Sequence, residues 1–140
     1  MNNKLIRRRL HDLVPYCHRR YIEDTPVIIP MLWYANKVVY TNNVGYYYRL
    51  NPNSLTHTAD DVKTAIYKGL AFCDMNDFFE AMDPEVFNRI PLKNAVTQCL
   101  DIFNRHPIES VKCYEKDFIE LMLRLNKALT IDQVAFRKKK

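Results

Sequence analysis

Apolar residues at helical spacing run through the second half of the chain and constrain its fold more than any other feature. They recur at intervals of three or four residues, which is the spacing along one face of an α-helix. Similar stripes begin near residue 60 and cover residues 108–129, and the clearest comprises Leu92, Val96, Cys99, Leu100 and Phe103. We predict a helix from each stripe, and we assign the apolar faces to the core.

Two shorter helices are predicted in the first half. Residues 3–13 carry apolar side chains on one side and arginines on the other, and Pro15 ends the pattern. A second helix can begin with Thr25 as its cap and Pro26 at the first helical position, where a missing N–H costs nothing. We expect this helix to run to about Ala35.

Strand-like sequence follows the second helix. Residues 37–41 and 46–50 are rich in valine and tyrosine, which favour β-strands, and Asn42-Asn43 can form the turn between them. The expected fold class is therefore α+β, predominantly helical with two or three short strands.

Composition excludes several classes of protein and site. The 140 residues are 48% apolar and 26% charged, as in ordinary globular proteins, and two glycines are too few for a glycine-rich phosphate loop. The cysteines are widely spaced, so a zinc site has no support, and we expect buried free thiols at Cys73, Cys99 and Cys113. Residues 27–35 form the longest apolar run, which is too short to span a bilayer. A cytoplasmic location is expected.

Basic residues gather at the two ends of the chain. The net charge is +5, while the middle of the chain is slightly acidic. Basic ends suit an anionic membrane surface or nucleic acid, and a peripheral position at the inner face of the membrane would fit. Solvated termini are the alternative, and for the tail they are the preferred interpretation. We divide the chain into residues 1–58, a helical region over 59–130 and a basic tail over 131–140.

Two adjacent carboxylates, Glu23 and Asp24, precede the second predicted helix. Acidic residues at a helix start are often capping groups, because the helix dipole favours negative charge there. Alternatively, one carboxylate takes a proton from an attacking hydroxyl, and the helix start keeps it ionised. The two carboxylates alone do not decide between these interpretations.

A tyrosine-rich block follows about twenty residues later. In a strand Tyr46 and Tyr48 would share one face, and Tyr47 and Arg49 the other. Aromatic rings suit a sugar face or a nucleobase, and an arginine suits a diphosphate, although an edge strand explains the tyrosines as well. His57 is either a solvated side chain or a ligand.

Taken together, four blocks resemble the second half of a family 2 glycosyltransferase of the kind that builds bacterial surface polysaccharides. The resemblance covers roughly residues 2–58, and the blocks stand in the order of the family. They are Asn3-Lys4-Leu5-Ile6-Arg7-Arg8, Tyr21-Ile22-Glu23-Asp24-Thr25, Ala35-Asn36-Lys37-Val38-Val39-Tyr40 and the stretch from Tyr46 to His57.

The resemblance implies the second half of a GT-A domain followed by a helical tail, and inverting transfer of a sugar from a nucleotide-sugar donor to a saccharide acceptor. Asp24 matches the catalytic base and Glu23 its neighbour in the acceptor site. Arg49 and Ser54 match a loop near the donor diphosphate, with Tyr48 beside them in the substrate site. His57 matches a position where some relatives offer a histidine to the metal or the diphosphate.

The nucleotide-binding half of such an enzyme has no counterpart in this sequence. The acidic nucleobase segment and the Asp-x-Asp motif for Mn²⁺ or Mg²⁺ are missing, so we assign no cofactor to this chain and expect the cation in a complete enzyme. Loss of that cation and of substrate positioning predicts no transfer by the isolated chain. Apolar surface over residues 27–50 is expected to favour self-association.

A non-catalytic alternative is a helical module that binds nucleic acid or protein. Aromatic side chains beside cations can bind single-stranded nucleic acid. Against nucleic acid, the body of the chain is mildly acidic and contains no recognisable binding motif. The residues by themselves leave enzyme and binding module open, and the resemblance favours a hexosyltransferase.

Overall fold

The computed structural model of the chain describes residues 3–14, 16, 22–52, 54, 61–82 and 92–138. The chain forms two compact units, Met1–Ala59 and Asp60–Lys140, and each is described by itself. The two units differ in character, because long helices build only the second.

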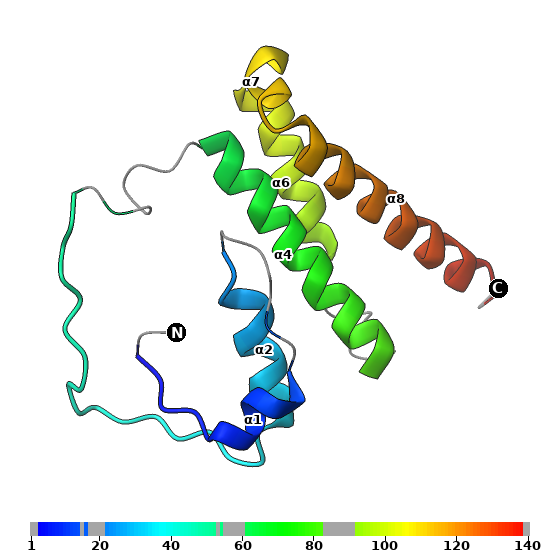
Figure 1. Cartoon of the computed structure of the whole chain (residues 1–140). Helices are drawn as coiled ribbons and strands as arrows, with labels where there is room; N and C mark the ends of the chain where they lie inside the picture. The colour runs from blue at the N-terminus through cyan, green and yellow to red at the C-terminus, as the bar shows by residue number, and fades with distance from the viewer. Residues whose placement is uncertain are drawn as a thin grey trace. The chain divides into compact units, whose positions relative to one another are not determined.

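The described residues of the first unit form two short helices, α1 (Arg8–Leu13) and α2 (Thr25–Tyr34), which are the blue helices of Figure 1. Their shared core is small and consists of Val14, Val27 and Met31, with partly buried Ile6, Leu10 and Tyr34 packed against it. The prediction of α2 is confirmed, but the helix begins one residue earlier than expected, so its N-cap is Asp24 and not Thr25, and Pro26 lies in its first turn. The predicted first helix is shorter than expected and begins at residue 8.

The two predicted strands are absent from the described residues, so the α+β fold class is wrong and the described chain is helical. Residues 37–50 run as an extended segment (Figure 1). A strand needs a paired neighbour and a buried face, yet Tyr40 is 88% exposed and Tyr47 is 86% exposed. At the predicted turn, the N–H of Asn43 donates to Oγ1 of Thr41 at 3.2 Å, a local bond that competes with strand pairing.

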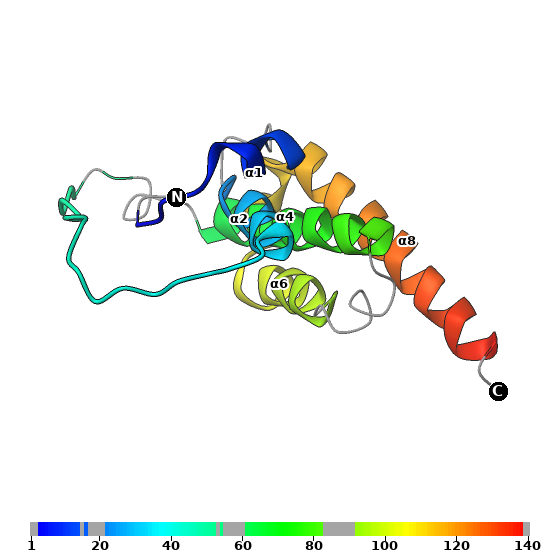
Figure 2. The ribbon, with the colours of Figure 1, turned by 90° about the horizontal axis from the view of Figure 1, so that it is seen from below.

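The second unit is built on three long helices, α4 (Asp61–Met82), α6 (Leu92–Arg105) and α8 (Glu115–Lys138), with the short α7 (Ile108–Lys112) before the last. Both α6 and α8 pack against α4, as Figures 1 and 2 show. Among the helices described, none is both long enough and apolar enough to cross a bilayer. The core of the unit comprises Val62, Ile66, Leu70, Cys73, Cys99, Ile102, Val111, Leu121 and Leu125.

The apolar stripes place the helices correctly but misassign several side chains. Residues 108–129 are not one helix, because a turn at Cys113 and Tyr114 separates α7 from α8. On α6, Ile102 is fully buried, whereas Leu100 is 56% exposed. Cys113 is exposed, so the expectation of a buried thiol there is wrong, while Cys73 and Cys99 are buried and free as predicted.

Helices α4 and α8 approach each other closely at Gly69. A Cβ atom at Gly69 would lie 2.9 Å from Cδ2 of Leu121. Contacts along the two helices advance in the same direction, since Tyr67 meets Asp117 and Asp74 meets Arg124. The two helices are therefore parallel, and the glycine lets them come together where Leu121 enters the core.

Candidate functional site

The two candidate carboxylates lie at the start of α2, and both are exposed. The Asp24 carbonyl oxygen accepts hydrogen bonds from the N–H groups of Val27 at 3.2 Å and Ile28 at 2.8 Å, which fixes the backbone at the helix start. Asp24 occupies the N-cap position, but its side chain makes no capping hydrogen bond to the described residues of α2. A capping hydrogen bond therefore does not hold this carboxylate, although the helix dipole still favours its negative charge.

The backbone immediately before the carboxylates is strained. Ile22 has a φ of 55°, in the left-handed region that β-branched residues rarely enter. Such a conformation costs about 1–3 kcal/mol and is often found where a fold holds functional side chains in place. The strained residue directly precedes Glu23 and Asp24 in the chain.

The remaining candidate residues lie on or after the extended segment. Tyr48 is 59% exposed, and Arg49 is exposed next to it. The N–H of Ser54 donates to the carbonyl oxygen of Asn51 at 2.9 Å, closing the predicted loop after the tyrosine block. His57 lies outside the described residues. The structure thus places Glu23 and Asp24 on a helix start and Tyr48 and Arg49 on an exposed segment of the same unit.

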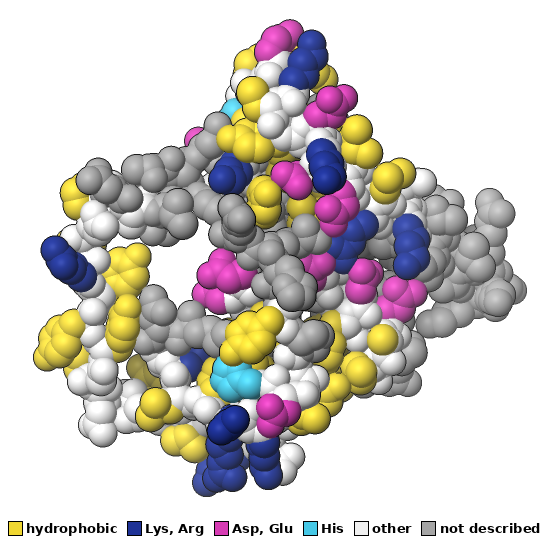
Figure 3. Space-filling view, viewed as in Figure 1, with side chains coloured by type: hydrophobic (Ala, Val, Ile, Leu, Met, Phe, Trp, Pro, Cys, Tyr) yellow, Lys and Arg dark blue, Asp and Glu magenta, His cyan; other side chains and the backbone are white. Residues whose placement is uncertain are grey.

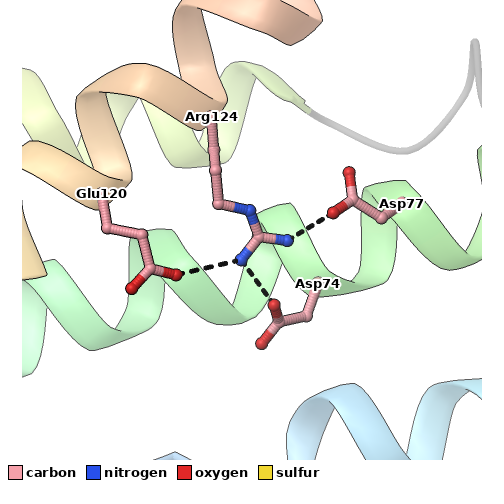
Figure 4. Close-up of polar contacts among 4 residues, drawn as sticks. All are labelled: Asp74, Asp77, Glu120 and Arg124. Atoms are coloured by element: carbon pink, nitrogen blue, oxygen red, sulfur yellow. Dashed lines mark hydrogen bonds and ion pairs between the residues drawn. The ribbon is translucent and has the colours of Figure 1, made fainter.

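The clearest polar cluster of the described chain lies elsewhere, between α4 and α8 (Figure 4). The guanidinium of Arg124 donates from Nη1 to Oδ1 of Asp74 at 2.5 Å and from Nη2 to Oδ2 of Asp77 at 2.6 Å. Its Nη1 also lies 3.8 Å from Oε1 of Glu120 on the same helix. Further towards the start of α8, the Tyr67 hydroxyl donates to Oδ2 of Asp117 at 3.1 Å.

This cluster, which we call the α4–α8 polar seam, is structural in character. Partial burial by itself lowers the pKa of Arg124, but hydrogen bonds and charge attraction from Asp74 and Asp77 outweigh it and raise the pKa above its ordinary value. The arginine therefore remains charged and holds the two helices together. Within the residues described, no group of three or more His, Cys, Asp or Glu side chains is arranged to hold a metal ion.

The sequence alone did not lead to this cluster. The spacing of Glu120 and Arg124 was a visible signal, because residues four apart are neighbours on a helix. Nothing in the sequence pairs Asp74 with a residue fifty positions later. That contact depends on the register of α4 against α8.

The buried thiols of Cys73 and Cys99 are expected to react slowly. Burial raises the pKa of Cys73 to about 11, although Arg124 opposes the shift, and burial likewise raises the pKa of Cys99 to about 11. Because the thiolate is the reactive form, both thiols should alkylate at least about 100-fold more slowly than exposed Cys113 near pH 8. Peptide-resolved mass spectrometry after timed alkylation would measure this. Equal labelling of Cys73 and Cys113 in the folded chain would contradict the assignment.

Basic side chains form an exposed surface at α1. Figure 3 shows dark blue side chains gathered over this helix, and Arg7, Arg8 and Arg9 are exposed. An anionic partner, such as a membrane surface, would meet positive charge at this place. That partner stays a prediction.

Comparison of the chain with protein-family models, with curated proteins and with solved structures gives no match in any of the three.

Proposed function

We propose that this chain supplies the acceptor-side carboxylates of an inverting glycosyltransferase that makes cell-surface polysaccharide. In the proposed reaction, Asp24 takes the proton of an acceptor hydroxyl, whose oxygen then attacks the anomeric carbon of the donor. The bond from that carbon to the diphosphate oxygen breaks, and the nucleoside diphosphate leaves from the opposite face of the sugar. Glu23 lies beside Asp24 in the acceptor site.

The observation that carries the proposal is the position and exposure of the Asp24 side chain at the start of α2. This residue stands at the N-cap of α2, is exposed, and makes no capping hydrogen bond to the described helix residues. The positive φ of Ile22 adds a conformational cost two positions earlier. An exposed carboxylate at a helix start, two residues after a strained position, supports a role in chemistry.

The extended segment over residues 37–50 supports the same proposal. It has the sequence of strands but lies exposed, with Val39 at 71% and Leu50 at 79% exposure. We propose that exposed Tyr48 and Arg49 on this segment meet the donor, with the cation supplied by the nucleotide-binding part of a complete enzyme.

The test replaces Asp24 by asparagine at the chromosomal locus of the source cell, where any complementary polypeptide is present. Loss of a general base lowers a rate by about 10²–10⁴-fold, so polymer made by this locus should fall to the level of a gene deletion. Surface hexose per cell and the size distribution of the polymer on a gel would measure it. The purified variant should keep the helical circular dichroism of the wild-type chain.

The matched control is Asp61→Asn, because Asp61 is also an exposed carboxylate in the first turn of a helix. This control should leave polymer synthesis unchanged. Normal polymer in the Asp24→Asn strain would refute the catalytic role. Tight, salt-dependent binding of a single-stranded oligonucleotide that Tyr48→Ala abolishes would instead support the nucleic-acid alternative.

A further inference from the structure

The outer face of α8 carries an ordered row of exposed side chains. Glu115, Ile119, Leu123 and Lys127 follow one another at intervals of four residues, so they form a single ridge on the helix. Ile119 is 49% exposed and Leu123 is 65% exposed. Phe118, Leu121 and Leu125 of the same helix belong to the core face. The ridge therefore points away from the bundle of its own chain.

The order of charges along this ridge is self-complementary. From Glu115 to Lys127 the four side chains are acidic, apolar, apolar and basic, and the midpoint of the ridge lies at the level of residue 121. A two-fold axis at that level would place Ile119 of one chain against Leu123 of the other, since both lie two residues from the midpoint. The same axis would place Glu115 against Lys127, each six residues from the midpoint, or about 9 Å along the helix.

We propose that a second copy of this chain packs on α8 in an antiparallel, two-fold arrangement through the ridge of Glu115, Ile119, Leu123 and Lys127. The contact is isologous, so each apolar pair and each ion pair occurs twice. The apolar pairs remove exposed surface from water, and the ion pairs fix the direction and register of the two helices. The proposal is independent of the glycosyltransferase function.

A second copy fits this ridge better than it fits the other exposed apolar region. Residues 37–50 contain Lys37 and Arg49 and no acidic residue, so antiparallel pairing of that segment with itself would bring like charges together. The α8 ridge has opposite charges at its two ends. Charge complementarity therefore favours self-pairing at α8.

The test measures the dimerisation of the whole chain by sedimentation velocity over a range of concentrations. A reductant is present throughout, because exposed Cys113 could otherwise link two chains. A contact of this limited size predicts a dissociation constant of about 10–100 μM. Glu115→Lys turns two attractive contacts into two repulsive ones and should weaken the dimer at least about tenfold.

The double variant Glu115→Lys with Lys127→Glu reverses the row and should restore the wild-type constant to within about threefold, because the charges again face opposite partners. Glu109→Lys makes the same charge change at an exposed residue outside the ridge and should leave the constant unchanged. All substituted side chains are exposed, so circular dichroism should match the wild-type spectrum.

Two results would overturn the proposal. One is a wild-type chain that stays monomeric at about 500 μM, roughly fivefold above the weakest constant expected. The other is a dimer that keeps its constant in Glu115→Lys, or that the double variant does not restore. The second result would assign self-association to another surface.

Discussion

Leu121→Ala is expected to lower the free energy of unfolding by about 3 kcal/mol, within the range of about 2–5 kcal/mol for fully buried leucines. Leu121 is 0% exposed and fills the space beside Gly69, where α4 and α8 come closest. Truncation would leave a cavity that α4 and α8 cannot readily close, because the contacts of Arg124 in the α4–α8 polar seam hold the two helices in register. Urea denaturation followed by circular dichroism would measure the loss.

Leu100→Ala is the matched control for this prediction. It removes the same atoms from a residue of α6 that is 56% exposed, so its cost should stay below about 1 kcal/mol. Equal costs for the two variants would mean that Leu121 does not form the centre of the core.

Arg124→Ala is expected to destabilise the chain by about 2 kcal/mol near neutral pH. Its side chain is 20% exposed and that of Asp74 is 23% exposed, so the pair lies between an exposed ion pair, at about 0–1 kcal/mol, and a broken buried pair, at about 3–5 kcal/mol. The variant leaves Asp74 and Asp77 together without their cation. Urea denaturation followed by circular dichroism at pH 7 would measure the deficit relative to the wild-type chain.

Arg105→Ala provides the comparison for the ion pair. Arg105 meets Asp101 at 3.4 Å, but its side chain is 70% exposed, so its loss should cost no more than about 0.5 kcal/mol. A deficit for Arg124→Ala no larger than that of Arg105→Ala would mean that the α4–α8 polar seam contributes no more than an exposed ion pair.

Local sequence signals predicted most of the helices, but they did not predict where every helix begins and ends. Thr25 and Pro26 predicted the start of α2 because helix starts have local rules. The break between α7 and α8 has no such signal, since neither proline nor glycine occurs from residue 108 to residue 129. The Tyr114 N–H donates to the Val111 carbonyl oxygen at 2.9 Å and closes a turn there.

The prediction of two strands, at residues 37–41 and 46–50, was wrong for a different reason. Valine and tyrosine favour strands only where a neighbour supplies hydrogen bonds and a packed face, and a propensity cannot supply that neighbour. The candidate site was likewise predictable only in part. Adjacent carboxylates ahead of a helix could be found by inspection, whereas the positive φ of Ile22 and the missing cap at Asp24 could not. Both are properties of the backbone and its surroundings.

The absence of a side chain at position 69 governs more than the packing of one leucine. Gly69 lies opposite Leu121, and a short distance along the same parallel helices Asp74 lies opposite Arg124. A bulky residue at 69 would act as a wedge, forcing α8 outward and lengthening the guanidinium contacts along with it. The packing of Leu121 and the ion pair of Arg124 with Asp74 would then be weakened together, because both depend on the same close spacing of α4 and α8.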